Sequence, residues 1–321
     1  MRSVLQNKDK FTDLAQVKTI YMGSPKISRI VLEGLLDLGL DVVAVISNED
    51  KPVGRKGILT PTPVKSLALE RGIPVFTPHR IRQDHQFLED IECDIILTMA
   101  YGQIVPQDVL DHPRLGALNL HGSLLPSLRG AAPIQRAIDL GLTETGITLM
   151  EMVDKMDAGR MFDKVKIQIE EDENYSSLCL KMAKASIEAV KRSLLDVLNG
   201  NNPGEEQDES LVTFASKITP EDEKLDFSWP CDKFVHRVAA LSLTPGAYCY
   251  LGQDKIKILG ARIAETEIKG EIGTIVEAKK RLLVQCGDGL VEILSLLPAG
   301  KKQMDARSFS NGRELLGKKL S

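Results

Sequence analysis

Short apolar segments alternate with helical patterns over the first 120 residues, and this alternation constrains the fold more than any other feature of the chain. Residues 18–23, 41–47 and 94–100 are apolar runs of strand length, and 41–47 is rich in β-branched residues, as is typical of a strand buried on both faces. Apolar residues at helical spacing occupy 27–38, and a second helical pattern occupies 63–71. Strands that alternate with helices predict an α/β fold class with a Rossmann-like, mostly parallel sheet.

The first predicted turn argues against a dinucleotide cofactor. It reads Met22-Gly-Ser-Pro-Lys-Ile27, with a single glycine where the Gly-x-Gly-x-x-Gly fingerprint needs three. The chain also lacks a Gly-x-x-x-x-Gly-Lys-Ser/Thr phosphate loop. The sequence therefore predicts a Rossmann-like sheet that holds its ligand without the usual phosphate cradle.

The character of the chain changes after a polar segment at 199–209. Before it, residues 175–198 have the spacing of a long amphipathic helix. From residue 211 onward, short apolar segments separated by turns predict a small β-barrel of the OB type. The predicted organisation is an N-terminal extension at 1–17, a Rossmann-like domain at 18–199, a linker at 200–210 and an OB-like domain at 211–321.

The charge is unevenly divided between these parts. The chain has 27% charged residues and a formal net charge of −4, which gives no whole-molecule case for binding nucleic acid. Residues 211–321, however, carry 17 Lys and Arg against 14 Asp and Glu. We therefore expect the second part to be the better candidate for facing a polyanion.

The sequence predicts a cytoplasmic, monomeric protein without a membrane segment or a metal. Apolar runs stay well below the roughly 18 residues that span a bilayer, and the N-terminus lacks the apolar stretch of a signal peptide. The five cysteines are scattered without a Cys-x-x-Cys pair, so we expect them to be reduced core residues.

The segment Asn119-Leu-His121 contains the strongest candidate for chemistry. It follows an alternating stretch that predicts a buried strand, and side chains two residues apart on a strand point to the same side. Taken alone, the pair also fits a polar strand end with a satisfied histidine. Asp157, which follows 36 residues after the histidine, is either a third member of a site or an ordinary turn residue.

Together these three residue types fit acyl transfer to an amine. A fixed amide N–H can stabilise the developing oxyanion, and a His–Asp pair can move the protons of the attacking and leaving nitrogens. A nucleophilic Ser or Cys is not required when the amine attacks directly. Ser123 lies close to His121, but Gly-Ser-Leu-Leu-Pro is not a nucleophile elbow, which argues against a serine hydrolase.

At these residues the sequence resembles the methionyl-tRNA formyltransferases, and the likeness covers nearly all of residues 18–321. The central motif is specific for enzymes that use 10-formyltetrahydrofolate, whereas the loop from Lys51 to Thr60 and the late Pro-Ala-Gly-Lys-Lys run narrow the likeness to the tRNA enzymes. The matching segments are Tyr21-Met-Gly-Ser-Pro25, 51–65, Ala100-Tyr-Gly-Gln-Ile-Val-Pro106, Asn119-Leu-His-Gly-Ser-Leu-Leu-Pro126, Arg129-Gly-Ala-Ala-Pro-Ile-Gln135, Met156-Asp-Ala-Gly159 and 294–304.

The resemblance implies a role for each of these residues. Asn119 would stabilise the oxyanion, His121 would handle protons and Asp157 would support it. The donor, 10-formyltetrahydrofolate, would be held largely through backbone and shape by Ser123, Leu124, Leu125 and Pro126. The acceptor would be initiator methionyl-tRNA, with Arg55 and Lys56 on a basic loop reaching toward it and the OB-like domain holding it. If the resemblance to the family is set aside, the basic loop is better explained as a plain surface turn.

The chain departs from the family pattern at a few positions, none of which is Asn119, His121 or Asp157. Family members usually have an acidic residue, a Phe, an Arg-aromatic pair and an acidic residue or Pro at the positions held here by Lys26, Ile27, Ser127-Leu128 and Arg160. Ser242-Leu-Thr-Pro245 likewise replaces a usual Asn-Pro-x-Pro. These departures leave open the detail of the methionyl pocket.

Two alternatives stay open from the sequence. One is a formyltransferase that acts on an amino sugar or another small amine, for which the basic insertion at 51–59 would be unnecessary. The other is a non-catalytic module that binds folate or tRNA, which the intact Asn, His and Asp set argues against.

Overall fold

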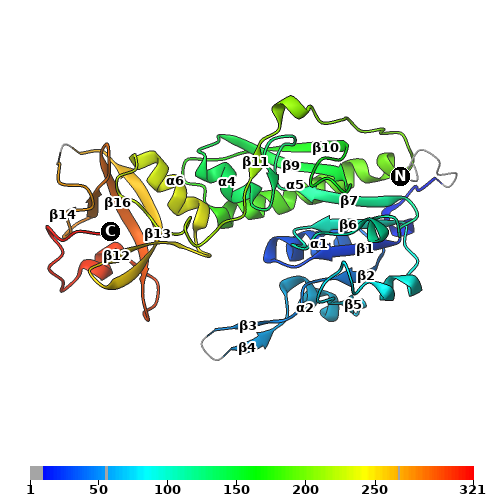
Figure 1. Ribbon diagram of the computed structural model, residues 1–321, viewed down its shortest axis with the longest axis horizontal. Coiled ribbons are helices and arrows are strands. Elements are labelled where there is room, and N and C mark those ends of the chain that lie inside the picture. The colour runs from blue at the N-terminus through cyan, green and yellow to red at the C-terminus, as the bar shows by residue number, and fades with distance from the viewer. Residues whose placement is uncertain (1–9, 55–56, 267) are drawn as a thin grey trace. The chain divides into compact units, whose positions relative to one another are not determined.

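A seven-stranded sheet in the order β10-β9-β7-β6-β1-β2-β5 organises the first part of the chain (Figure 1). The computed structural model describes residues 10–54, 57–266 and 268–321. The chain divides into two units, of which the first comprises Met1–Ala131, Glu144–Gln168 and Cys179–Ala215. The strands of its main sheet are β1 (Thr19–Gly23), β2 (Val42–Ile46), β5 (Val75–Phe76), β6 (Ile95–Met99), β7 (Gly116–His121), β9 (Glu144–Glu151) and β10 (Met161–Gln168).

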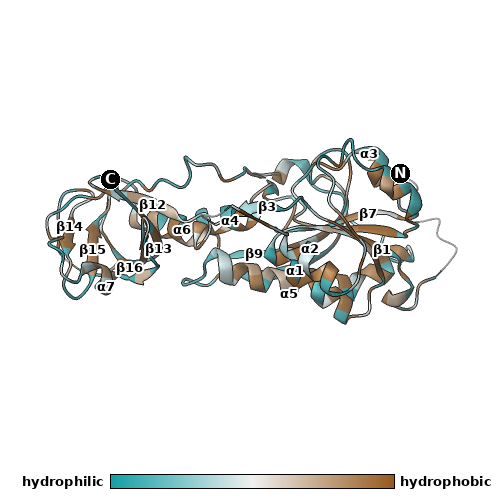
Figure 2. Cartoon of the chain, turned by 90° about the horizontal axis from the view of Figure 1, so that it is seen from below, coloured by the Kyte–Doolittle hydropathy of each residue, from teal (hydrophilic) through white to brown (hydrophobic). Residues whose placement is uncertain are grey.

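Most strands of this sheet run parallel, which confirms the predicted fold class. Neighbouring strands from β5 to β7 pair in parallel, whereas β9 pairs antiparallel with β7 and with the edge strand β10. Strands β1 and β6 are buried along their whole length, as the continuous apolar runs predict. Figure 2 shows the strands of this unit, such as β7, coloured mostly as hydrophobic.

Local sequence signals explain where the helices of this unit begin and how they pack. Pro63 occupies the first turn of α2, and the Thr62 hydroxyl accepts the Lys65 N–H at 3.1 Å as its cap. Gly34 lies inside α1 because a Cβ there would meet Ile187 Cδ1 of α5 at 2.3 Å. The helices are α1 (Lys26–Asp37), α2 (Pro63–Glu70), α3 (Gln107–Leu110) and α5 (Tyr175–Leu198, of which residues 179–198 belong to this unit), with short 3-10 helices at η2 (Leu14–Gln16), η3 (Gln86–Asp90) and η4 (Glu209–Leu211).

Two small strand pairs complete the first unit. Strand β8 (Arg129–Gly130) pairs in parallel with β11 (Phe214–Ala215), which brings together segments more than 80 residues apart. Strands β3 (Lys51–Val53) and β4 (Ile58–Thr60) form an antiparallel hairpin that pairs with no other described strand. The sequence indicated only a polar loop here, yet Val53, Ile58 and Leu59 are more than half exposed on this hairpin.

The described part of the N-terminal extension packs against the first unit. The Phe11 N–H donates to Asn199 Oδ1 at 2.9 Å, and Asn199 Nδ2 donates back to the Phe11 carbonyl at 2.8 Å. The Arg114 guanidinium lies 5.6 Å from the centre of the Phe11 ring. Residues 10–17 are therefore anchored at the end of α5.

The second unit comprises Ala132–Thr143, Ile169–Leu178 and Ser216–Ser321, and is built on a curled antiparallel sheet. This sheet follows the order β12-β13-β16-β15-β14, with β17 added to β16, as the predicted barrel-like domain requires. The strands of the sheet are β12 (Ala247–Leu251), β13 (Asp254–Ala264), β14 (Ile275–Glu277), β15 (Leu282–Gln285), β16 (Leu290–Pro298) and β17 (Met304–Asp305). The helices of this unit are α4 (Pro133–Asp139), α6 (Cys231–Leu241) and α7 (Ala306–Ser310). The domain boundaries given from the sequence stay a prediction.

Helix α6, which the sequence pattern did not indicate, packs on this sheet and on α4. Phe234 and Val238 of α6 are fully buried in its core. Asp222 accepts two bonds from the Arg136 guanidinium, at 3.1 and 2.8 Å, and this pairing holds the pKa of Asp222 at about 2. Arg237 of α6 in turn pairs with Asp139 of α4 at 2.5 Å. A partly buried charge network therefore joins these two helices.

Candidate active site

The carboxyl end of β7 brings Asn119 and His121 together. Both side chains lie on the same face of the sheet, because the two residues are two positions apart on one strand. In the register of the sheet, Asn119 pairs with Thr98 and Met150, and His121 pairs with Thr148. His121 is 5% exposed, whereas Asn119 is partly exposed. The Asn119 side-chain amide makes no hydrogen bond with any residue that the structure describes, so its N–H groups are available to a ligand.

The position of the His121 ring is set by one backbone carbonyl. Nε2 lies 2.9 Å from the Leu128 carbonyl oxygen. Because a carbonyl only accepts, Nε2 carries the hydrogen in this contact, and in the neutral ring Nδ1 is then the nitrogen that can take up a proton. Nδ1 lies 3.6 Å from Asp157 Oδ1, so the imidazolium would form beside a carboxylate.

Asp157 is itself held in place by the backbone. Its φ of 51° is in the left-handed region, which Asp tolerates better than most residues. Its Oδ2 accepts the Gly130 N–H at 2.9 Å, while Oδ1 faces the ring of His121. The structure thus brings together the three residues that the sequence placed in one site.

The segment after His121 is tied to β9 through one threonine. The Thr148 hydroxyl donates to the Ser123 carbonyl at 2.7 Å and accepts the Leu125 N–H at 3.1 Å. Leu125 is buried against Met150. Ser123 donates its own hydroxyl to the Ser127 carbonyl at 2.5 Å, so it is occupied within the loop.

Leu124 and Pro126 remain partly exposed on this loop. A Cβ at Gly146 would come within 2.5 Å of Leu124 Cδ2, so this glycine lets the loop lie close to β9. The four predicted folate residues Ser123, Leu124, Leu125 and Pro126 therefore offer a fixed backbone with two partly exposed apolar side chains.

A buried arginine supports the loop that carries Asp157. Arg129 is 1% exposed, and its Nε donates to Gln207 Oε1 at 2.9 Å. The Gln207 amide donates to the carbonyls of Asp157 and Gly159, both at 2.8 Å. Arg129 also pairs with Glu209 at 2.8 Å, and this bond, with a second from a lysine, lowers the pKa of Glu209 to about 2.

The sequence pattern missed three residues that hold the site. Thr148 sits in the middle of a strand, Gln207 lies in the predicted linker, and the Thr213 hydroxyl accepts the Leu128 N–H at 2.8 Å across 85 residues. No local signal marks Thr213. For Gln207, the signal in the sequence is a single amide side chain among four acidic residues, Glu205, Glu206, Asp208 and Glu209.

The departures from the family pattern leave the three central residues of the site untouched. Leu128 is buried, with a φ of 59°, and contacts His121 through its backbone. Arg160 pairs with Glu206 at 2.7 Å, Ile27 is buried in α1, and Lys26 is exposed at the start of that helix. The remaining predicted site residues, Arg55 and Lys56, lie outside the described residues.

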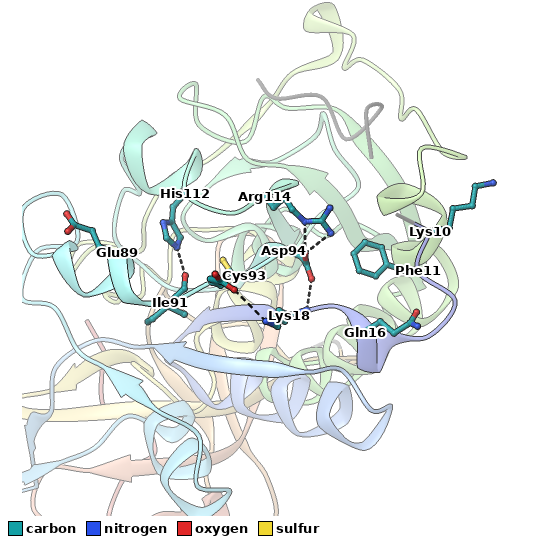
Figure 3. A pocket seen from close by; sticks show the side chains of 11 residues that line it. Lys10, Phe11, Gln16, Lys18, Glu89, Ile91, Cys93, Asp94, His112 and Arg114 are labelled. Carbon is teal, nitrogen blue, oxygen red and sulfur yellow. Dashed lines mark hydrogen bonds and ion pairs between the residues drawn. The ribbon is translucent and has the colours of Figure 1, made fainter. Parts of the chain in front are cut away.

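A hollow at the opposite edge of the sheet carries no comparable chemistry (Figure 3). It lies where β1 and β6 begin, whereas open α/β sheets bind ligands at the carboxyl ends of their strands. Asp94 accepts the Lys18 N–H at 2.9 Å and pairs with Arg114 at 2.8 Å. His112 contacts the Ile91 carbonyl at 2.8 Å.

Neither a metal-binding cluster nor a membrane-spanning helix occurs among the residues that the structure describes. No group of three or more His, Cys, Asp or Glu side chains among them is arranged to hold a metal ion. Within the same ranges, no helix combines the length and the apolar character needed to cross a membrane.

Comparison with known proteins places both parts of the chain in one family. Residues 17–194 match the family described as "Formyl transferase", and residues 217–314 match "Formyl transferase, C-terminal domain". The chain is 43% identical over 298 residues to a methionyl-tRNA formyltransferase of Listeria innocua, covering 92% of this chain and 95% of that protein. It is 40% identical over 309 residues to the enzyme of the same name from Staphylococcus epidermidis, covering 94% and 99%.

Solved structures support the fold at lower identity. The chain superposes on HypX from Aquifex aeolicus in complex with tetrahydrofolic acid with a TM-score of 0.65 and 18% identity, covering 92% of this chain and 47% of that one. It superposes on WlaRD, a sugar 3N-formyl transferase, with a TM-score of 0.63 and 18% identity, covering 89% and 99%.

Proposed function

The chain belongs to the formyl transferase family, and we infer that it transfers the formyl group of 10-formyltetrahydrofolate to the free amino group of initiator methionyl-tRNA. Asn119 and His121 carry this inference, because they lie on one face of β7 with Asp157 beside the histidine. The relatives at 40–43% identity favour methionyl-tRNA over an amino sugar as the acceptor.

In this proposal each of the three residues has one task. The free N–H of Asn119 stabilises the oxygen that becomes negative as the amine attacks the formyl carbon. His121 Nδ1 takes the proton that the amine must lose, and Asp157 stabilises the resulting imidazolium from 3.6 Å. The leaving nitrogen of the folate then accepts a proton, and His121 returns to its neutral form.

The loop after β7 fits a flat, partly apolar folate. Thr148 fixes its backbone through two hydrogen bonds, and Leu124 and Pro126 stay partly exposed. Binding through backbone and shape agrees with Ser123, whose hydroxyl is already used inside the loop. These residues would hold the donor, whose formyl group supplies the transferred carbon.

Two surfaces are proposed to meet the tRNA. One is the β3–β4 hairpin, since Arg55 and Lys56 follow β3 and precede β4 in the sequence. An arginine there can contact phosphates and exposed bases of an RNA end. The other is the barrel-like unit, where residues 211–321 carry the positive excess.

Formylation assays test the function directly. The purified chain is incubated with 10-formyltetrahydrofolate and either charged initiator tRNA or a nucleotide-linked amino sugar. Product on the tRNA is expected, and transfer to the sugar alone would contradict the inference. His121→Ala should lose most turnover but keep folate binding. His112→Ala is the matched control, because that ring also contacts a backbone carbonyl but lies at the other end of the sheet.

A second pair of variants tests the hairpin. Arg55→Ala should weaken tRNA use much more than folate binding. Arg71→Ala is the control, because Arg71 follows α2 and pairs at the surface with Glu33 at 3.5 Å and Asp37 at 3.9 Å. If the two variants bind tRNA with equal affinity, the hairpin is not part of the acceptor site.

A further inference from the structure

The hydroxyl of Thr98 is buried without a partner. Thr98 lies in β6 and is 5% exposed, and its Oγ1 makes no hydrogen bond with any described residue. Only Tyr101 and Thr145 share this condition in the described part of the chain. Because buried polar groups in native proteins are nearly always paired, a hydroxyl left without a partner calls for an explanation.

The neighbours of Thr98 narrow that explanation. In the sheet register Thr98 pairs with Met22 of β1 on one side and with Asn119 of β7 on the other, so all three side chains lie on one face. Met22 is fully buried, and Ile96 and Ala117, one step back on that face, belong to the apolar core. Among these neighbours Asn119 alone can hydrogen-bond. Adjacent strands lie about 4.8 Å apart, which brings a threonine hydroxyl within reach of an asparagine amide.

An asparagine in an oxyanion site needs such a neighbour. The oxygen and nitrogen ends of its amide have nearly the same shape, so sterics alone do not decide which end faces the ligand. Only the N–H end can stabilise an oxyanion. The Asn119 amide has no hydrogen bond to the described residues, so a donor to its Oδ1 would fix the productive orientation.

We propose that Thr98 is a positioning residue for formyl transfer: its hydroxyl donates to Asn119 Oδ1 in the reacting complex and turns the Asn119 N–H toward the developing oxyanion. This rests on the proposed function of Asn119. The hydroxyl thereby gains the partner that it lacks, and the bond acts on turnover more than on ligand binding.

Isosteric variants test the proposal. Thr98→Val removes the hydroxyl while keeping the shape, and should lower kcat about tenfold, equivalent to about 1.4 kcal/mol, while both KM values stay within about twofold. Thr98→Ser should restore kcat. Thr145→Val is the matched control, because it removes another unpaired buried hydroxyl of the same sheet, five residues along β9 from the Asn119 partner Met150.

The Asn119→Ala background separates positioning from a general structural effect. There Thr98→Val should change kcat no further, because its target is gone. The proposal is overturned if Thr98→Val keeps kcat within about twofold in a wild-type chain that formylates methionyl-tRNA. It is equally overturned if Thr145→Val lowers kcat as much as Thr98→Val does. The same holds if Thr98→Val lowers the kcat of the Asn119→Ala chain by another tenfold. A wild-type chain that transfers no formyl group to methionyl-tRNA would instead refute the proposed function, and this proposal with it.

Discussion

Asp157→Asn removes one charge from the site and changes little else. The left-handed φ of 51° at this position suits Asn as well as Asp. An Asn oxygen can still accept the Gly130 N–H that Asp157 Oδ2 accepts at 2.9 Å. The Gln207 bond to the backbone carbonyl of residue 157 does not involve the side chain. The substitution therefore isolates the carboxylate charge beside His121.

The distance between the two groups sets the expected size of the effect. Asp157 Oδ1 and His121 Nδ1 are 3.6 Å apart, and both side chains are largely buried. At an effective dielectric of about 20, a carboxylate and an imidazolium at this distance attract by about 4–5 kcal/mol. Because each 1.36 kcal/mol of barrier is a factor of ten, kcat should fall roughly 10³-fold. The neutral ring feels no comparable attraction, so substrate binding should change little.

Single-turnover formylation of methionyl-tRNA, with folate binding measured separately, is the suitable assay. Asp154→Asn is the matched control, since Asp154 lies in the same loop but is exposed. It should keep kcat within about twofold, because exposed charges are screened by water. If Asp157→Asn retains more than a third of wild-type kcat, the carboxylate does not stabilise a charged His121. A loss of folate binding would instead point to a structural role.

Three further variants test the surrounding structure. Gly130→Ala should destabilise the first unit by roughly 2–4 kcal/mol in urea denaturation, because Gly130 has a φ of 123° and a Cβ would meet the Ala215 carbonyl at 2.7 Å; normal stability would refute that contact. Gln207→Leu should cost about 2–3 kcal/mol of stability by the same measurement and lower kcat, since it removes three hydrogen bonds, one of them donated by the buried Arg129. The pKa of Asp222 is lowered to about 2 by Arg136, so its contribution is fully present above about pH 4 and lost as pH falls through about 2. Asp222→Asn should therefore cost roughly 1–2 kcal/mol at pH 7, and the difference from wild type should vanish near pH 2.

Periodicity was sufficient to predict the elements that bury apolar surface. The run at 41–47 predicted a fully buried strand, and β2 occupies Val42–Ile46. The amphipathic spacing at 175–198 predicted a helix, and α5 spans Tyr175–Leu198. Periodicity did not predict the hairpin of β3 and β4, because the hairpin has no buried face and therefore no apolar pattern.

The three central residues of the candidate site could be proposed from the sequence because their side chains carry the chemistry. Asn119 and His121 share a strand, so spacing alone places them on one face. The residues that hold them act mostly through long-range contacts with backbone groups. Thr213 contacts Leu128 across 85 residues, and Gln207 contacts Asp157 across 50. Such pairs leave no periodic trace, because any chain segment offers the same carbonyls and N–H groups.

The same distinction explains how the chain tolerates its departure at Leu128. The group that contacts His121 there is the carbonyl, which is the same for every residue type. What must be preserved is the left-handed conformation that aims this carbonyl, and the Thr213 hydroxyl, which accepts the Leu128 N–H at 2.8 Å, helps to hold it. A change of side chain at 128 therefore alters packing and leaves the orientation of the His121 ring intact, whereas a change at Thr213 would disturb that ring without touching it.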